Sequence, residues 1–351
     1  DRTYVMGNNI NAPAGTQNSL AFGTRASVGG ASSIAMGLDS KTNTDGSIAM
    51  GLYSEAGGPI TNGKPGINAT AIGTEAKALG LSAVAMGYRA TVENGHDSIA
   101  IGVAAKSTNK KSTAIGTLSE ASGEQSTVIS NNYDAKGGQS ISIASGRRSQ
   151  IYGAETTVSG EQSVAIGDTN NIESARTYAL GNNINAAAGT QDSLIFGTRA
   201  TVEGVAHIAM GKTATAHTDS SIAIGNGAES GGKGANDGFN GTNALAIGAD
   251  SKGLGTGAVA IGSHATVKDG HDSIAMGVYS QTTNNKAISI GAYNEASGVQ
   301  STVIGSNYNT KNDAGVSVAS GTRSQVYGVA TTVSGDNSVS IGDTNTIASA
   351  R

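Results

Sequence analysis

Ser98-Ile99-Ala100-Ile101-Gly102 decides the fold, because close copies of this stretch recur along the whole chain. Five further copies occupy residues 33–37, 47–51, 163–167, 221–225 and 273–277. The step from one closing glycine to the next is usually 14 residues, as from Gly37 to Gly51 and from Gly73 to Gly87. A fixed short period is the signature of structural units that stack on one another.

The motif alternates large and small side chains, which is the period of a β-strand. Ile99 and Ile101 are therefore expected on one face and Ala100 on the other. A second alternation follows the glycine, as in Thr74-Glu75-Ala76-Lys77-Ala78, where small residues stand between polar ones. Each unit is predicted to hold two short strands, one lined with Ile, Val and Met and one lined mostly with Ala and Ser.

A coil with this period is small, because at roughly 3.3 Å per residue its contour is only about 46 Å. We therefore predict a flattened roll in which large side chains on one wall fit small ones on the other. Five methionines that replace Ile in the motif are assigned to this core: Met36, Met50, Met86, Met210 and Met276. Such a thin core gives little hydrophobic protection, so association with a neighbouring chain is expected.

A longer repeat divides the chain into two tandem copies, residues 1–175 and 176–351. Arg2-Thr3-Tyr4-Val5-Met6-Gly7 returns as Arg176-Thr177-Tyr178-Ala179-Leu180-Gly181. Later in the chain, the stretch that begins at Gly153 returns at Gly328, so the offset between the copies grows by a single position. The stretch at the joint does not resemble a linker. We therefore expect the second copy to continue the solenoid of the first.

Two departures from the regular step occur in both copies. The first is an insertion, within residues 53–68 of the first copy and 227–242 of the second. The second is a half-coil step, where two glycines lie seven residues apart, at Gly146 and Gly153 and again at Gly321 and Gly328. Such a step could swap which strand forms the inner wall. Insertions at a coil corner project as loops, and loops on a rigid scaffold often carry function.

Candidate ligand contacts are assigned to the insertions and to exposed turn residues: Tyr53, Pro59, Ile60, Lys64, Tyr88, Arg147, Arg148, Lys233 and Phe239. Arg147 and Arg148 suit an acidic ligand, but the interpretation as a solvated turn is favoured. The insertions themselves are compatible with tolerated, functionless loops.

Composition excludes several classes of function. The net charge is −4 and aromatic residues make up 4% of the chain, which disfavours nucleic-acid binding. The absence of cysteine excludes disulfides and thiolate metal sites. His96-Asp97 and His271-Asp272 are interpreted as polar turns that precede strands, not as metal ligands. Carboxylates show no recurring pair of the kind a glycosidase needs. We expect no catalytic residues, no metal and no cofactor.

The Ser-Ile/Val-Ala-Ile/Met-Gly unit, repeated at this regular step, resembles the head domain of YadA-like trimeric autotransporter adhesins of Gram-negative bacteria. The resemblance covers essentially the whole chain. It implies an all-β, left-handed parallel β-roll assembled as a homotrimer at the tip of a stalk on the outer membrane. It also implies that the apolar residues of the motif pack inside the roll and at the trimer axis.

The resemblance implies a non-enzymatic bacterial cell-surface adhesin that attaches to host proteins by multivalent binding. Family ligands include collagen, fibronectin, laminin and receptors of the CEACAM type. The chain begins and ends inside the repeat pattern, so we expect a piece of a longer protein whose membrane anchor lies outside it. Two alternatives stay open: a surface or phage fibre that binds or processes carbohydrate, and an ice-binding solenoid, which the irregular placement of Thr disfavours.

Overall fold

The computed structural model describes residues 2–58, 65–132, 141–232, 241–307 and 316–348, together with the backbone of 309–310 and 313–314. The chain divides into two compact units, Asp1–Arg176 and Thr177–Arg351, which are described separately. No helix that could span a membrane is found among these described residues.

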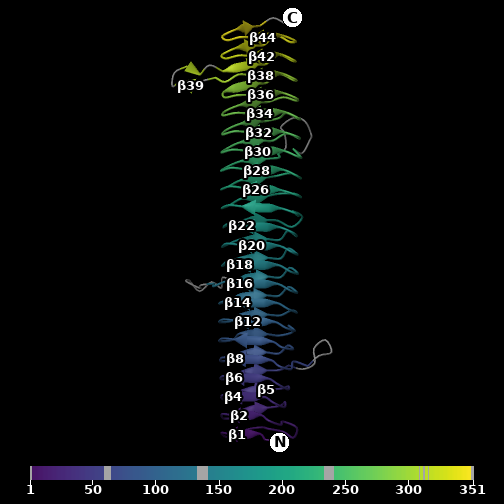
Figure 1. The fold of residues 1–351 in the computed structure, drawn as a ribbon, viewed down its shortest axis with the longest axis vertical. Coiled ribbons are helices and arrows are strands. Elements are labelled where there is room, and N and C mark those ends of the chain that lie inside the picture. The colour runs from purple at the N-terminus through teal and green to yellow at the C-terminus, as the bar shows by residue number, and fades with distance from the viewer. Residues whose placement is uncertain are drawn as a thin grey trace. The chain divides into compact units, whose positions relative to one another are not determined.

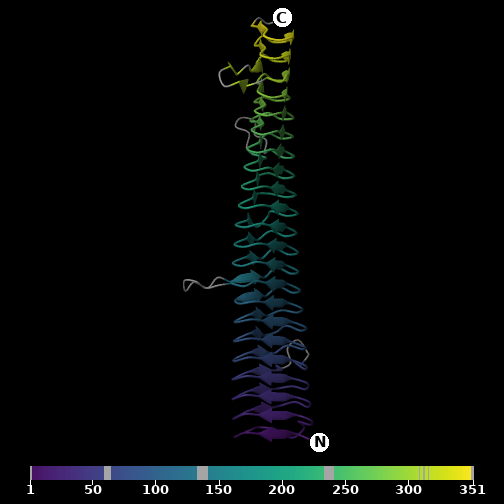
Figure 2. The same cartoon turned by 60° about the vertical axis from the view of Figure 1, so that its left-hand side comes forward.

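Each unit is a stack of coils in which the chain passes alternately through two parallel sheets, sheet A and sheet B (Figures 1 and 2). Sheet A of the first unit consists of β1 (Tyr4–Met6), β2 (Leu20–Phe22), β4 (Ile34–Met36), β6 (Ile48–Met50), β8 (Thr70–Ile72), β10 (Val84–Met86), β12 (Ile99–Ile101), β14 (Thr113–Ile115), β16 (Thr127–Ile129), β18 (Gln150–Tyr152) and β20 (Val164–Ile166). Sheet B of the first unit consists of β3 (Ser27–Val28), β5 (Lys41–Thr42), β7 (Glu55–Ala56), β9 (Lys77–Ala78), β11 (Thr91–Val92), β13 (Lys106–Ser107), β15 (Ser119–Ala121), β17 (Ser142–Ala144), β19 (Thr157–Val158) and β21 (Asn171–Ile172).

The second unit repeats this arrangement. Its sheet A consists of β22 (Tyr178–Leu180), β24 (Leu194–Phe196), β26 (Ile208–Met210), β28 (Ile222–Ile224), β30 (Leu245–Ile247), β32 (Val259–Ile261), β34 (Ile274–Met276), β36 (Ile288–Ile290), β38 (Thr302–Ile304), β42 (Gln325–Tyr327) and β44 (Val339–Ile341). Its sheet B consists of β23 (Asn185–Ala186), β25 (Thr201–Val202), β27 (Thr215–Ala216), β29 (Glu229–Ser230), β31 (Lys252–Gly253), β33 (Thr266–Val267), β35 (Gln281–Thr282), β37 (Asn294–Ala296), β41 (Ser317–Ala319), β43 (Thr332–Val333) and β45 (Thr346–Ile347). A separate antiparallel pair is formed by β39 (Asn309–Thr310) and β40 (Asp313–Ala314).

The register of the strands places each motif on the next. Ala100 pairs with Ala85 on one side and Ala114 on the other, and the flanking residues match in the same way. All these pairings within the two sheets are parallel, so one repeat of the sequence closes one coil, as between Ala100 and Ala114. The prediction of an all-β parallel solenoid is confirmed.

The prediction of which side chains line the interior is wrong. The central alanines of the sheet A strands, such as Ala85 and Ala100, are fully buried, whereas Ile101 is 37% exposed. The inward positions of sheet B are also small or modest, as in Ala78 and Val92. Both inner walls are therefore lined mostly by Ala, Ser and Val, with single Ile side chains such as Ile151 and Ile195, because the narrow space between the sheets does not hold a continuous row of Ile side chains.

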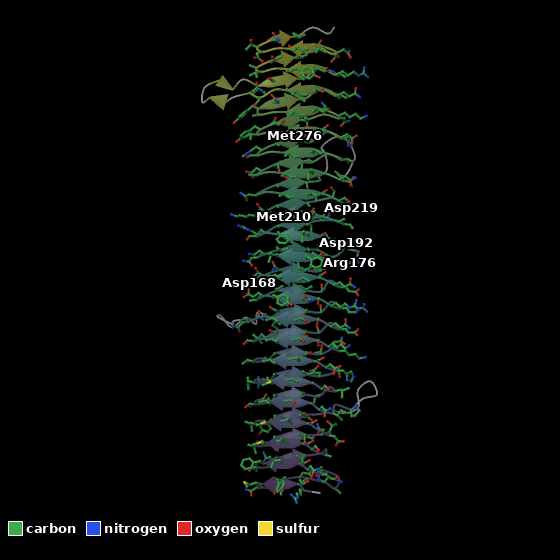
Figure 3. The ribbon with its side chains drawn as sticks, in the orientation of Figure 1. Asp168, Arg176, Asp192, Met210, Asp219 and Met276 are labelled. Atoms are coloured by element: carbon green, nitrogen blue, oxygen red, sulfur yellow. The ribbon has the colours of Figure 1, made fainter. Side chains whose placement is uncertain are left out.

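The large apolar side chains instead form an exposed row on the outer face of sheet A, which we call the apolar stripe. The motif methionines belong to it and are not core residues: Met36 is partly buried, while Met50, Met86, Met210 and Met276 are 36–39% exposed. In the second unit, Met210 and Met276 lie over the strands, whereas Asp219 lies at a turn (Figure 3). The stripe extends through every described strand of sheet A in both units.

The serine and the glycine of the motif have separate structural roles. The buried serine hydroxyl donates to a carbonyl in the turn of the next coil, as from Ser33 Oγ to Thr44 O at 3.0 Å and from Ser98 Oγ to Asn109 O at 2.7 Å. The glycine allows successive turns to approach closely. A Cβ added at Gly51, where φ is +134°, would lie 2.4 Å from the carbonyl oxygen of Gly73.

The structure shows two insertions in each unit, at opposite corners of the coil. The first insertion falls between a strand of sheet B and the next strand of sheet A, namely between β7 and β8 or between β29 and β30. A second insertion, which was not predicted from the sequence, falls between sheet A and sheet B, after β16 or after β38, and the half-coil step comes directly after it. The motif-like segment that follows it, Ser142–Ala144, lies in sheet B and pairs with β15. The half-coil step therefore puts a motif-like sequence on the other sheet and leaves the alternation of the sheets unchanged.

Candidate functional site

The sequence-predicted contact residues that the structure describes all lie at turns. Tyr53 and Tyr88 are 50% and 44% exposed, and they stand on the turns that follow β6 and β10. The Arg147 guanidinium lies 3.1 Å from Glu161, and Arg148 Nε donates to Gln125 Oε1 at 2.9 Å. The two arginines thus bond to neighbouring coils, as expected of a solvated turn. Pro59, Ile60, Lys64, Lys233 and Phe239 lie outside the described residues.

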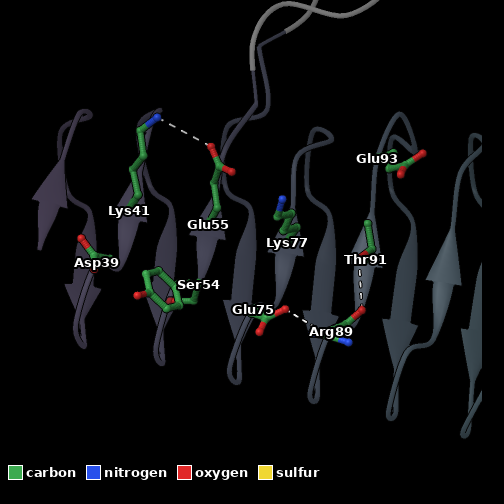
Figure 4. Close-up of a pocket in the computed structure, with 10 residues that line it drawn as sticks. Asp39, Lys41, Ser54, Glu55, Glu75, Lys77, Arg89, Thr91 and Glu93 are labelled. Carbon is green, nitrogen blue, oxygen red and sulfur yellow. Dashed lines mark hydrogen bonds and ion pairs between the residues drawn. The ribbon is translucent and has the colours of Figure 1, made fainter.

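Tyr53 belongs to a polar groove of about 560 Å³ in the first unit, which we call the β5–β11 groove (Figure 4). Its lining residues come from four successive coils: Asp39, Lys41, Tyr53, Ser54, Glu55, Glu75, Lys77, Arg89, Thr91 and Glu93. Tyr88, Arg147 and Arg148 are not among them. The groove therefore brings together one of the predicted contact residues with nine that the sequence did not single out.

One wall of the groove is the outward row of sheet B. Lys41, Glu55 and Lys77 occupy the same position on β5, β7 and β9, so the sign of the charge alternates from coil to coil. Lys41 Nζ lies 3.7 Å from Glu55 Oε1. Both groups are partly exposed, and such pairs contribute only about 0–1 kcal/mol, so they organise the surface more than they stabilise the fold.

The other wall is a column of turn residues two places after each motif glycine. These residues have left-handed backbone conformations, with φ between +54° and +59° at Asp39, Tyr53, Glu75 and Arg89. Arg25 Nε donates to Asp39 Oδ1 at 2.7 Å, and Arg89 Nε donates to Glu75 Oε2 at 2.7 Å. The hydrogen bond from Arg25 holds the pKa of the Asp39 carboxyl below its ordinary value.

The charge arrangement favours recognition over acid–base chemistry. A general acid needs a carboxyl whose pKa is raised towards neutrality, usually by burial or by a second carboxylate. Asp39, Glu55 and Glu75 are instead each held by a cation. The Arg89 guanidinium also lies over the Tyr88 ring, 4.9 Å from its centroid. This cation–π contact helps to hold the Arg89 side chain in place at the edge of the β5–β11 groove.

A second cluster surrounds His217 in the other unit, and sequence reasoning missed it. His217 Nδ1 lies 3.0 Å from Glu203 Oε2, and Nε2 lies 3.3 Å from Glu229 Oε1. Glu229 also bonds Lys252 at 3.1 Å. The hydrogen bond with Glu229, and then that with Glu203, raises the pKa of His217, while the pKa of Glu229 is lowered to about 2. The signal was the spacing between Glu203 and His217, which equals one repeat and puts them on adjacent coils.

A short aromatic column was also missed. His264 and Tyr279 are stacked with ring centroids 4.5 Å apart, and Tyr279 and Tyr293 are stacked at 5.2 Å. All three occupy the left-handed turn position of successive coils. Their spacing along the sequence is close to the repeat length, and this is the signal that could have found them.

The second insertion is accommodated by a buried asparagine at its first edge. In an uninterrupted turn, the carbonyl of Leu52 accepts a hydrogen bond from the Glu75 N–H of the next coil. After β16 this acceptor position is filled by the side chain of Asn132, whose Oδ1 accepts from Glu155 N at 2.8 Å. Asn307 Oδ1 does the same for Ala330 N at 2.8 Å. The row of hydrogen bonds between the turns of successive coils, which we call the turn ladder, thus continues past the place where the chain leaves the coil.

Among the residues that the structure describes, no group of three or more His, Cys, Asp or Glu side chains could hold a metal ion. His96 is 8% exposed, at the turn before β12.

Comparison with family models gives matches along both units. The model described as YadA head domain repeat matches residues 14–40, 29–54, 65–90, 94–119, 107–129, 153–169, 208–228, 240–265, 269–294 and 286–307. Together these segments cover more than half of the chain. They include most of the β5–β11 groove and the aromatic column. Comparison with curated proteins gives no match.

Proposed function

Because the chain belongs to the family of YadA head domain repeats, we propose that it is the adhesive head of a trimeric autotransporter on the surface of a Gram-negative bacterium. The head would be a left-handed β-roll without enzymatic activity. The observation that carries this proposal is the repeated family match on two units, each of which bears an apolar stripe on the outer face of its sheet A. The two tandem copies, 1–175 and 176–351, are proposed to stack as one solenoid.

The apolar stripe supports assembly of three chains. Soluble monomers rarely leave a long continuous apolar surface uncovered, and such surfaces mark association sites. Phe22, Ile129 and Ile166 are 45%, 43% and 42% exposed on one face of one unit. Three stripes that meet at a common axis would remove them from water.

Light scattering tests the assembly. The expected mass is three times the 34.6 kDa of one chain. Met86→Lys places a charge in the stripe and should shift the mass towards one chain, whereas Thr91→Lys, which alters the outer face of sheet B, should leave it unchanged. A wild-type protein with the mass of one chain would reject the trimer.

We propose that the β5–β11 groove and the turn residues around it contact a host protein, either a matrix protein such as collagen, fibronectin or laminin, or a receptor of the CEACAM type. A trimer presents three copies of each surface, so weak single contacts combine into avidity. Tyr53 is the expected anchor, because an exposed tyrosine beside paired charges is typical of a binding hot spot.

Binding to an immobilised panel of these proteins tests the groove. Tyr53→Ala combined with Lys77→Glu should weaken binding of one ligand by about tenfold or more. Thr157→Ala, on the outer face of sheet B away from the groove, is the matched control. Equal binding by both variants would remove the groove from the proposal.

The insertions are proposed as additional contacts, through Pro59, Ile60 and Lys64 in the first copy and Lys233 and Phe239 in the second. Tyr88, Arg147 and Arg148 are proposed as contacts at the turns. Deletion of residues 59–64 and 233–240 should weaken attachment to host cells. Unchanged attachment would mean that the insertions are tolerated loops.

A further inference from the structure

Two glutamines interrupt the apolar stripe, one in each unit. The outward positions of the described sheet A strands hold apolar or aromatic residues or Thr, except at Gln150 in β18 and Gln325 in β42. Each glutamine shares its strand with a tyrosine, and the hydroxyl of Tyr152 lies 3.4 Å from Gln150 Oε1, that of Tyr327 3.2 Å from Gln325 Oε1. Each unit thus carries one layer of amide and phenol groups in an otherwise apolar surface.

A stripe built from a short repeat has a problem of alignment. Its neighbouring coils present nearly the same side chains, so a second copy that slides by one coil, about 4.8 Å, still meets an apolar surface. Hydrophobic contact alone would therefore tolerate several staggered arrangements. A buried polar residue in an apolar seam can select one register, because only one alignment satisfies its hydrogen bonds.

We propose that the Gln150–Tyr152 and Gln325–Tyr327 layers fix the axial register in which copies of this chain associate, an inference that rests on the assembly through the apolar stripe proposed above. In register, the glutamine of one copy lies at the height of the glutamine and tyrosine of its neighbour. The carboxamide donates and accepts, and the phenol does both, so the layer is complementary to itself.

A shift by one coil removes this match. Gln150 would then lie at the height of Val164 or Thr127 in the neighbouring copy, because β18 lies between β20 and β16 in sheet A. Val164 has no polar group, and Thr127 offers one short hydroxyl where the aligned layer offers a carboxamide and a phenol, so the shifted arrangement supplies fewer partners for the amide. Leaving a buried amide unpaired is costlier than replacing it with an apolar group. The main effect of the glutamines is therefore to destabilise the shifted arrangements, more than to stabilise the aligned one.

Cysteine cross-linking tests the proposal cleanly, because the chain contains no cysteine. Ile101 and Ile115 occupy the same outward position on adjacent coils. Chains with Ile101→Cys and differently tagged chains with Ile115→Cys are refolded together and oxidised. Copies in register give mainly 101–101 and 115–115 disulfides, whereas copies shifted by one coil give 101–115 disulfides. The readout is the ratio of unlike to like disulfides.

Gln150→Ile combined with Gln325→Val should raise this ratio by about tenfold or more, because the unpaired amides of the two layers no longer penalise the shift. Thr70→Val is the matched control, since it removes a polar group from the same column without touching either layer, and it should leave the ratio unchanged. An equal ratio in the glutamine variant and the control would overturn the proposal while the assembly stands. A protein with the mass of one chain and no disulfide between chains would overturn the assembly and the register together.

Discussion

Replacing Asn132 with alanine should open the solenoid locally at the second insertion. Asn132 is 2% exposed, and its side chain bonds in two directions. Its Nδ2 donates to Leu118 O at 2.9 Å on the preceding coil, and its Oδ1 accepts from Glu155 N at 2.8 Å on the following one. Alanine removes both bonds and also the contact of Oδ1 with the Ser142 hydroxyl at 3.0 Å.

The loss should amount to about 2–4 kcal/mol of local stability, taking about 1 kcal/mol for each lost bond. Asn132→Asp should cost at least as much, because a carboxylate keeps the acceptor for Glu155 N but faces the Leu118 carbonyl without a donor.

Hydrogen exchange with mass spectrometry measures this effect at the Glu155 amide, and thermal melting measures it for the whole protein. Asn131→Ala is the matched control, because the neighbouring Asn131 is exposed and its replacement should change stability by less than about 0.5 kcal/mol. If the Glu155 amide exchanges equally fast in the two variants, the side chain of Asn132 does not carry the turn ladder and the reasoning fails.

Three further predictions concern the interior, the turns and the charged cluster. Ala100→Leu should destabilise by about 1–3 kcal/mol or more and Ile101→Leu by less than about 1.5 kcal/mol in chemical denaturation, since only Ala100 faces the packed interior. Gly51→Ala should cost about 3 kcal/mol because of the 2.4 Å approach to the Gly73 carbonyl, and Gly15→Ala clearly less, because nothing lies within 4 Å of the added carbon there. His217→Asn should remove stability that is fully present below about pH 6.5 and lost as pH rises through the raised pKa of His217. Melting curves of both proteins across pH should therefore converge at high pH, and a constant difference would contradict the assignment.

The period of the sequence predicted the fold, but the period alone could not place the interior. Alternation fixes which residues share a face, and Ile99 and Ile101 do lie together, opposite Ala100. It does not say which face is inside. The usual rule that large apolar residues are buried fails for most of the motif here, because the narrow space between the two sheets is filled mainly by Ala, Ser and Val, with only an occasional Ile. The contour of about 46 Å for one coil already implied that the space between the two sheets is narrow.

The candidate site was less predictable, because its residues meet only through the stacking of coils. Tyr53 could be singled out as an aromatic residue at a turn, and it does line the β5–β11 groove. Its neighbours Lys77 and Arg89 come from later coils of the chain and carry no local motif. Comparing the residues at each outward position of the repeat along successive coils, on strands and at turns, would have found the groove, the aromatic column and the His217 cluster.

The two copies show how such a scaffold can change its surface while its interior stays the same. When the copies are aligned so that Arg2 matches Arg176, His217 corresponds to Asn43, and Glu229 corresponds to Glu55. Asn43 Nδ2 donates to Glu55 Oε1 at 2.9 Å, so the bond between coils is kept by a neutral amide in one copy and by a titratable ring in the other. Glu203 corresponds to Gly29, and its carboxylate is what gives the ring a second acceptor. Because outward side chains bond to one another on the surface and lie apart from the alanine core, they can change without changing that core. The first copy thereby gains a groove of alternating charge, and the second a pH-sensitive cluster, on the same coil.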